Sequence, residues 1–304
     1  MAPIPPTLGT RVTTIGIVGL GLLGGAVAQR LREAGHAVIG YDVVPACVER
    51  LVALGGTAAR SAADVARAAD AVATLLPSLP IVEQAILGPG GITAGARPGQ
   101  TIFQMSTISP ALTRRLAVEC AARGVAFLDC PVSGTSGMVE RGDGIIFVGG
   151  DRMLYERWRP VLESILPRAV FIGAAGQAMV LKLVANLLVA LNSAAAAEAL
   201  SMAERAGLDV RLALEVLSGS AATSRMLEVR GPMIARREFP PQMKLDLFMK
   251  DLHLIQEAAA AVGAPVPLTD VAETLYRDAQ SAGRGGDDLA VVVTALGKSP
   301  GRAG

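Results

Sequence analysis

The sequence predicts an α/β domain built on a doubly wound parallel sheet, followed by an all-helical domain. Three observations lead to this fold class. Short apolar runs alternate with helical patterns in the first half, strand-type runs stop near Gly176, and long Ala- and Leu-rich stretches fill the remainder. Strand–helix alternation is typical of a parallel sheet covered by helices on both faces. We therefore expect a flexible tail at 1–11, a sheet domain over 12–176 and a helical domain over 177–304.

The expected strands are near-continuous apolar runs, as strands buried on both faces require. In chain order they are Val12–Val18, Ala37–Tyr41, Ala71–Leu76, Thr101–Met105, Ala126–Leu128 and Ile145–Val148. Helical patterns lie between them at Ala26–Glu33, which Gly35 follows where a C-cap glycine belongs, and at Ser61–Ala68. The expected helices of the second half are Gln177–Ala206, Val210–Ser218, Leu245–Val262 and Pro267–Ser281.

The composition indicates a folded and nearly neutral protein. Hydrophobic residues make up 51% of the 304, which excludes the disordered class. Because the formal net charge is only +1, no basic field favours nucleic acid as a partner. The three cysteines, Cys47, Cys120 and Cys130, form no C-x-x-C pair. They indicate a reducing, cytoplasmic location, and they argue against a zinc cluster, so we expect no metal.

The most apolar stretch, Met179–Leu200, has the length of a membrane span. It contains Lys182, Asn186 and Glu198, which are too polar for a lone span. The N-terminus shows neither the basic nor the apolar region of a signal peptide. We therefore expect a buried helix of a soluble protein and no membrane partner.

A glycine-rich turn follows the first expected strand. Its residues are Gly19, Leu20, Gly21, Leu22, Leu23 and Gly24. Gly19 permits a tight turn, Gly21 lets the backbone approach a pyrophosphate, and Gly24 lets helix and strand pack closely. The next helix offers free N–H groups to the phosphates. Because strand, turn and helix occur in this order, the turn predicts a Rossmann domain that binds a dinucleotide. The alternative is a purely structural turn.

An acidic residue, Asp42, ends the second expected strand. Its distance from Gly24 is near that of a carboxylate that binds the ribose of a dinucleotide. Such a carboxylate accepts from the 2′-hydroxyl group and repels a 2′-phosphate, and no arginine immediately follows it. The sequence therefore favours NAD over NADP as cofactor. The alternative is a solvent-exposed aspartate in a turn.

Two well-known dehydrogenase arrangements are absent from the sequence. The only histidines, His36 and His253, lie in a turn and in a helical stretch without a partner motif, so we expect both to be structural. The positions four residues after the three tyrosines hold Pro45, Arg159 and Gln280, so no Tyr-x-x-x-Lys pair exists. The acid–base residue must therefore be sought elsewhere.

A lysine near the start of the long helix is a candidate. Lys182 and Asn186 are four residues apart, so they share one helix face, and their flanking residues are apolar. An apolar setting disfavours the charged form of a lysine and lowers its pKa, which makes the amine usable for acid–base chemistry. The alternative is a lysine whose charged end reaches the solvent.

A glycine- and hydroxyl-rich segment, Asp129–Gly144, joins two strand-like stretches. The backbone N–H groups of Ser133 and Gly134, with the Ser133 hydroxyl, could hold a carboxylate. The alternative is a glycine-rich hairpin without a ligand.

Together these segments resemble the β-hydroxyacid dehydrogenase family, which includes 3-hydroxyisobutyrate dehydrogenase and tartronate semialdehyde reductase. The resemblance spans about residues 14 to 290 and keeps the family's order of motifs. The matching segments are Gly19–Gly24, Leu76-Pro77, Met105–Pro110, Asp129–Gly144, Gly176–Asn186 and Lys250-Asp251-Leu252.

The resemblance implies a role for each matching residue. Lys182 matches the catalytic lysine and Asn186 the asparagine that orients the substrate. Ser133 and Gly134 match the loop that grips the substrate carboxylate, and Thr135 stands where the family usually has a second glycine, so the pocket is expected to differ there. The remaining matches are Leu76, Pro77 and Thr107 as cofactor contacts, Lys250 as a contact to cofactor and substrate, and Asp251 as a helix-positioning partner.

The resulting hypothesis is reversible, NAD-dependent oxidation of a small 3-hydroxy acid, with Lys182 as general acid and base in a cleft between the domains. Two alternatives remain open: an NADP-dependent aldehyde or imine reductase on the same scaffold, and a non-catalytic NAD-binding scaffold. The long helix is apolar over more than one face, with Leu183, Leu187, Leu188, Leu191 and Ala194–Ala197. We therefore expect a homodimer or homotetramer formed through the helical domain.

Overall fold

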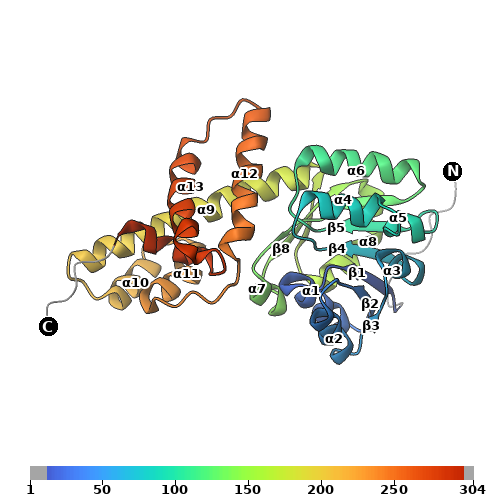
Figure 1. The fold of residues 1–304 in the computed structure, drawn as a ribbon, viewed down its shortest axis with the longest axis horizontal. Helices are drawn as coiled ribbons and strands as arrows, with labels where there is room; N and C mark the ends of the chain where they lie inside the picture. The colour runs from blue at the N-terminus through green and yellow to red at the C-terminus, as the bar shows by residue number, and fades with distance from the viewer. Residues whose placement is uncertain (1–11, 298–304) are drawn as a thin grey trace. The chain divides into compact units, whose positions relative to one another are not determined.

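The computed structural model describes residues 12–297, and the chain divides into two compact units, residues 1–182 and 183–304 (Figure 1). The tail predicted at 1–11 lies outside the described residues. The domain boundary predicted after residue 176 falls just before helix α9 begins at Gln177.

The first unit contains a nine-stranded sheet in the order β3-β2-β1-β4-β5-β6-β8-β7, with β9 paired to β8. The strands are β1 (Thr14–Val18), β2 (Ala37–Tyr41), β3 (Thr57–Ala58), β4 (Ala71–Thr74), β5 (Thr101–Gln104), β6 (Ala126–Asp129), β7 (Val132–Ser133), β8 (Ile145–Gly150) and β9 (Ala169–Gly173). Strand β1 pairs with β2 on one side and β4 on the other, so the strand order reverses beside it. This reversal is the switch point at which doubly wound sheets bind ligands.

The sheet is parallel from β3 to β6 and mixed beyond. Strand β8 runs antiparallel to β6 and to β7, and parallel to β9. The doubly wound α/β class is confirmed, but the expectation of a parallel sheet was wrong for this end. The residue pattern of β8 requires burial and does not specify its direction.

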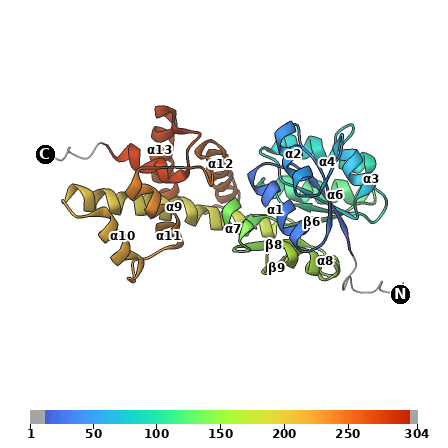
Figure 2. The same ribbon diagram turned by 90° about the horizontal axis from the view of Figure 1, so that it is seen from below.

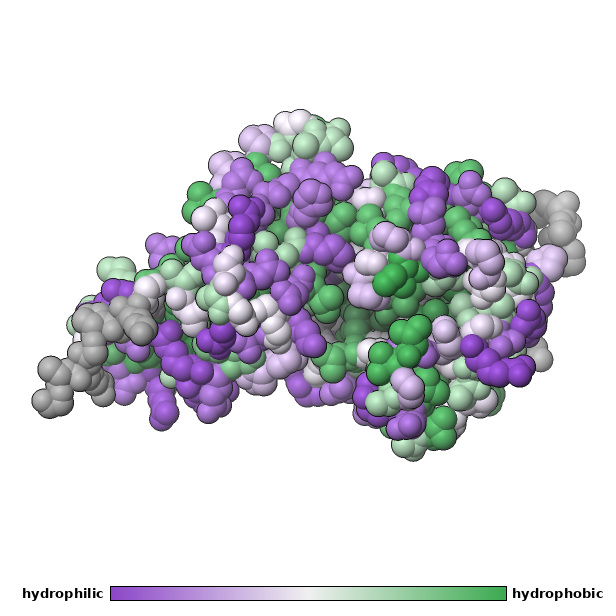
Figure 3. Space-filling view, in the orientation of Figure 1, coloured by the Kyte–Doolittle hydropathy of each residue, from purple (hydrophilic) through white to green (hydrophobic). Residues whose placement is uncertain are grey.

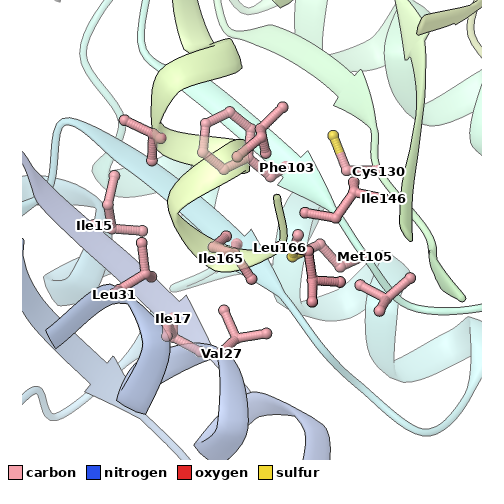
Figure 4. Close-up of a cluster of buried hydrophobic side chains, with 14 of the residues drawn as sticks. Ile15, Ile17, Val27, Leu31, Phe103, Met105, Cys130, Ile146, Ile165 and Leu166 are labelled. Atoms are coloured by element: carbon pink, nitrogen blue, oxygen red, sulfur yellow. The ribbon is translucent and has the colours of Figure 1, made fainter. Parts of the chain in front are cut away.

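Two layers of helices cover the two faces of the sheet. The helices of this unit are α1 (Leu22–Glu33), α2 (Pro45–Ala53), α3 (Ala62–Ala68), α4 (Leu79–Leu87), α5 (Ile92–Gly95), α6 (Pro110–Ala122), α7 (Ser136–Glu140) and α8 (Arg152–Ile165). One buried cluster joins the sheet to α1, α2 and α8, and Figure 4 shows Val27, Leu31 and Ile165 of that layer around Ile15 and Phe103. A second cluster joins it to α3, α4 and α6, and Figure 2 shows α8 apart from these helices. Both faces of the sheet are therefore buried.

The described part of the second unit is helical, as the sequence predicts. Its elements are the long helix α9 (Gln177–Arg205), which starts in the first unit, then α10 (Val210–Ser218), α11 (Arg225–Arg236), α12 (Leu245–Ala261), α13 (Pro267–Ala279) and the short η1 (Gln280–Arg284) and η2 (Leu289–Leu296). An isolated β-bridge joins Lys244 to Asp288. Tyr276 on α13 is fully buried and donates to the carbonyl oxygen of Ala190 on α9 at 2.8 Å.

Helix α9 is long and apolar enough, by length and composition, to cross a membrane. Of its most apolar 18-residue window, 44% is buried within the structure. Core helices of soluble proteins meet the same criteria of length and composition.

Candidate functional site

The glycine-rich turn joins β1 to α1, and the packing at two of its glycines excludes any side chain. Gly19 has φ +96°, and a Cβ there would lie 2.3 Å from the Leu75 carbonyl oxygen. A Cβ at Gly24 would lie 2.0 Å from the Gly19 carbonyl oxygen. At Gly21 the space that a Cβ would occupy is open within 4 Å. These three environments match the three tasks that the fingerprint assigns to its glycines.

Helix α1 begins at Leu22, four residues before its predicted start. Gly21 is its N-cap, no side chain caps it, and its first turn holds no acidic residue. No side chain caps the first-turn N–H groups, and no carboxylate of that turn competes for them. This arrangement fits a pyrophosphate, which helix N-termini bind through free N–H groups and the helix dipole.

Asp42 follows β2 and is tied to the glycine-rich turn. Its Oδ2 accepts from the Leu20 N–H at 2.6 Å, and its Oδ1 accepts from the Val44 N–H at 2.8 Å. The carboxylate is therefore held at a fixed place beside the turn, as a ribose-binding group must be.

A surface hollow of about 620 Å³ adjoins this carboxylate. It is lined by Asp42, Pro45, Val48, Glu49, Val52 and Ala53, so its lining is apolar with two carboxylates and no basic residue. Figure 3 shows hydrophobic side chains over α1 and α2. Leu22 of α1 and Val52 of α2 are exposed apolar residues. An apolar, acidic hollow suits a neutral ring system better than a phosphate.

The ends of β4 and β5 are joined by a buried polar network that fixes another predicted cofactor contact. The Ser106 hydroxyl accepts from the Leu76 N–H at 2.8 Å and donates to the Thr74 carbonyl oxygen at 3.2 Å. The Gln104 side chain binds both backbone groups of Ser106. Leu76 is half-buried, Pro77 is exposed and Thr107 is half-buried. Ser106 and Gln104 were not among the predicted site residues, although Ser106 lies inside one of the matching motifs.

The predicted substrate loop contains a short helix. Ser133 lies in β7, opposite Ile145 of β8, and Gly134 leads into α7. Thr135 is 9% exposed and is the N-cap of α7, where its hydroxyl accepts from the Met138 N–H at 3.3 Å. The hydroxyl of Thr135 therefore serves the loop's own backbone.

The lysine and asparagine of α9 are both buried. Lys182 is 7% exposed and Asn186, one turn later, is 3% exposed. Asn186 Nδ2 donates to Asp251 Oδ2 on α12 at 2.8 Å, and Lys250 Nζ lies 3.1 Å from Asp251 Oδ1. Asp251 thus contacts two of the predicted site residues.

The first turn of α9 is bound to a carboxylate at the end of β6. Asp129 is fully buried, and its Oδ2 accepts from the N–H groups of Gly176 and Met179, each at 3.0 Å. Burial raises the pKa of Asp129 to about 7, and the two backbone hydrogen bonds oppose this rise. Asp129 opens the predicted loop, but sequence reasoning gave it no role because its partners lie far along the chain.

Two buried cysteines and a histidine of the described residues are poor candidates for the chemistry of the site. Burial raises the pKa of Cys120 to about 12, and it raises the pKa of Cys130 as well, so neither thiol suits nucleophilic chemistry. Burial also lowers the pKa of His36, which precedes β2. Within residues 12–297, no group of three or more His, Cys, Asp and Glu side chains is placed to hold a metal ion.

Comparisons with known proteins cover nearly all of the described chain. Residues 14–186 match the family model described as the NAD-binding domain of 6-phosphogluconate dehydrogenase. Residues 175–296 match the model described as NAD-binding of NADP-dependent 3-hydroxyisobutyrate dehydrogenase. The two matches meet near the start of α9, at the level of the candidate lysine.

Individual relatives agree with these models. The chain is 34% identical to 2-hydroxy-3-oxopropionate reductase of Escherichia coli (strain K12), covering 93% of this chain and 96% of the relative. It is also 34% identical to NAD-dependent L-serine dehydrogenase of Pseudomonas aeruginosa, covering 91% and 96%. The crystal structure of 3-hydroxyisobutyrate dehydrogenase from Salmonella typhimurium is 31% identical, with a TM-score of 0.86 over 93% of this chain and 99% of that one.

Proposed function

This chain belongs to the β-hydroxyacid dehydrogenase family of nicotinamide-dependent enzymes, and we propose that it transfers hydride reversibly between NAD and a small 3-hydroxy acid. The proposed substrates resemble 3-hydroxyisobutyrate or 2-hydroxy-3-oxopropionate. The observation that carries the proposal is Lys182, a buried lysine one turn before the buried Asn186. A lysine removed from water can act as an acid and a base near neutral pH, which oxidation of a hydroxyl group requires.

The predicted substrate-site residues divide the tasks of the proposed reaction among them. The Ser133 hydroxyl and the N–H groups of Ser133 and Gly134 bind the substrate carboxylate. Asn186 donates to the substrate hydroxyl oxygen, since Nδ2 carries a second hydrogen besides the one given to Asp251. Lys182 Nζ accepts the hydroxyl proton during oxidation and returns it during reduction. The nicotinamide supplies the hydride acceptor or donor, and Lys250 assists in binding cofactor and substrate.

A substrate panel tests this function. The purified protein is assayed by absorbance with NAD and with NADP on 3-hydroxyisobutyrate, glycerate, serine, threonate and 3-hydroxypropionate, with the 2-hydroxy acid lactate as control. We expect at least one 3-hydroxy acid to reduce NAD and lactate to be inert. The proposal fails if no 3-hydroxy acid reduces either nucleotide, or if lactate reacts as fast as the best of the panel.

The proposed preference for NAD rests on charge beside the glycine-rich turn. A 2′-phosphate would meet the carboxylates of Asp42 and Glu49, and no basic residue lines the adjoining hollow to offset them. The ribose 2′-hydroxyl of NAD instead gives Asp42 a hydrogen bond.

The variant Asp42→Asn should weaken this preference. Asparagine keeps one oxygen that accepts from the Leu20 N–H, gives up the bond from the Val44 N–H, and removes the negative charge. Since a hydrogen bond to a charged group contributes about 1.5–3 kcal/mol, the ratio of kcat/KM for NAD to that for NADP should fall by about tenfold or more. The control is Glu119 of α6, an exposed carboxylate that pairs with Arg123. Glu119→Gln should leave the ratio unchanged. An unchanged ratio in Asp42→Asn would contradict the assignment.

We also propose a homodimer or homotetramer formed through α9, in the cytoplasm. Val180, Val184 and Leu188 recur every four residues on this helix and are 44%, 49% and 52% exposed. Such an apolar stripe on a surface is typical of an interface. The three cysteines are free thiols, which supports a reducing compartment.

Size-exclusion chromatography with light scattering measures the mass of the assembly. The unaltered chain should elute at two or four times the monomer mass, and the double variant Val184→Asp/Leu188→Asp should shift to the monomer. Val118→Asp, at a 69% exposed valine of α6, is the matched control and should leave the mass unchanged. A monomeric unaltered chain at micromolar concentration contradicts the assembly.

A further inference from the structure

The start of α9 lacks a side-chain cap of its own. Gly176 is the residue whose carbonyl oxygen accepts the first helical hydrogen bond, from the Val180 N–H at 3.0 Å. Gly176 has φ +91°, and a Cβ there would lie 3.2 Å from the Pro110 carbonyl oxygen. The position therefore favours glycine, which has no oxygen to offer to the N–H groups of the first turn.

Asp129 supplies the missing cap from another element. Serine or aspartate at an N-cap normally accepts from the N–H three residues later, as Asp151 does for Leu154 at the start of α8. In α9 that N–H belongs to Met179, and it donates to Asp129 at the end of β6. The second bond to Asp129, from the Gly176 N–H, fixes the residue at the helix start as well. Two bonds to one carboxylate oxygen thus hold the end of the helix against the sheet.

This cap lies between two parts of the proposed site. Met179 precedes Lys182 by less than one helical turn, and Asp129 precedes Ser133 by four residues in the same loop. A helix end fixed by Asp129 therefore has its lysine fixed relative to the segment that binds the substrate carboxylate. The two hydrogen bonds to Asp129, from Gly176 and Met179, lie within the first unit.

The site of this carboxylate is costly for an ionised group. Asp129 is fully buried, and among the described residues its Oδ1 has no hydrogen-bond partner. An ionised carboxylate in such a place destabilises the fold unless its hydrogen bonds compensate. The two N–H groups of α9 are the compensation that the structure provides.

We propose that Asp129 is a positioning residue of the reaction, which holds Lys182 at a fixed distance from the substrate loop by capping α9 from β6. This inference rests on the proposed function for its catalytic consequence. Its structural core, the anchoring of the first turn of α9, does not depend on which substrate is used. A misplacement of about 1 Å in a reacting group can lower a rate by about 10²-fold.

Two variants and a matched control test the inference. Asp129→Leu keeps the approximate size but accepts no hydrogen bond, and Asp129→Asn keeps one accepting oxygen. The control Asp151→Leu removes a cap of the same kind from α8, which carries no predicted site residue. Each protein is assayed for kcat, for the KM of substrate and of NAD, and for hydrogen–deuterium exchange of the backbone over residues 176–186.

The expected pattern separates positioning from general stability. Asp129→Leu should lower kcat by about 30-fold or more with the KM for NAD nearly unchanged, and should speed exchange over 176–186. Asp129→Asn should recover most of the lost kcat and most of the protection from exchange over 176–186. Asp151→Leu should change neither, although it destabilises the protein.

Three results would overturn the inference. They are wild-type exchange over 176–186 in Asp129→Leu, wild-type kcat in a folded Asp129→Leu, and an equal loss of kcat in Asp151→Leu. If Asp129→Leu does not fold, Asp129→Asn decides. An Asp129→Asn protein with wild-type exchange over 176–186 but a kcat that stays low contradicts the inference too. If the unaltered protein turns over none of the substrates, the proposed function fails, and the exchange measurement alone still decides whether Asp129 anchors α9.

Discussion

Lys182→Ala should lower kcat by about 10³-fold, within the range that general acid–base catalysis contributes, while the Kd for NAD changes by less than about twofold. The reason is that the amine is proposed to hold or release a proton in the transition state, whereas the cofactor is proposed to bind at the glycine-rich turn and Asp42. Pre-steady-state and steady-state absorbance measure kcat, and fluorescence titration of the nucleotide measures Kd.

Two further variants make this result specific. Lys182→Arg keeps a positive charge, but a guanidinium does not give up its proton, so it should fail to restore turnover. Lys244→Ala removes an exposed lysine that precedes α12 and should leave kcat unchanged. A Lys182→Ala protein with at least a tenth of the normal kcat would show that the proton moves through another group, and a scaffold protein without catalysis would show no turnover in any variant.

Breaking the buried ion pair of the second unit should have the largest effect on stability. Arg230 and Asp288 are 2% and 0% exposed, and the Arg230 Nε–H donates to Asp288 Oδ1 at 3.0 Å. Asp288 also accepts from the N–H groups of Gln242, Met243 and Ala290, so it ties α11 to the segment that enters α12. Asp288→Asn leaves a buried guanidinium without a counter-charge, which should cost about 3–5 kcal/mol of unfolding free energy.

Urea unfolding followed by far-ultraviolet circular dichroism measures this loss. The double variant Arg230→Met/Asp288→Asn removes both charges, so it should be less destabilised than the sum of its two single variants. On the same helix, Glu228 pairs with Arg225 on the surface, and Glu228→Gln should cost less than about 0.5 kcal/mol. A loss in Asp288→Asn no greater than that of the surface variant would contradict the role given to the buried pair.

The parts of the fold that repeat a local pattern were predictable from the sequence. The six expected strands exist as β1, β2, β4, β5, β6 and β8, because each is an uninterrupted apolar run. The two-residue strands β3 and β7 were not predicted, since a run of two residues fits a loop equally well, and the five-residue strand β9 was missed as well. The start of α1 was placed late, because Gly24 and Gly25 have low helix propensity, and it is packing against Gly19 that requires glycine there.

The site shows the same division between local and distant information. The glycine-rich turn, Asp42 and the pair Lys182 and Asn186 could be proposed from the sequence, since each is defined by its neighbours in sequence. Asp129 accepts from N–H groups 47 and 50 positions away, and Asp251 accepts from Asn186, 65 positions away. Such partners are brought together by the topology of the sheet and the helices, and no spacing rule in a single sequence predicts them.

The two γ atoms of Thr135, the N-cap of α7, have separate effects. The Thr135 oxygen orders the turn through Met138, whereas its methyl group only adds bulk. Serine would retain the hydroxyl and delete the methyl group, and valine would keep the bulk and delete the hydroxyl. Under the proposed function, bulk beside the substrate and rigidity of the loop can therefore be altered one at a time at this position, which makes residue 135 a starting point for redesigning which acids are accepted.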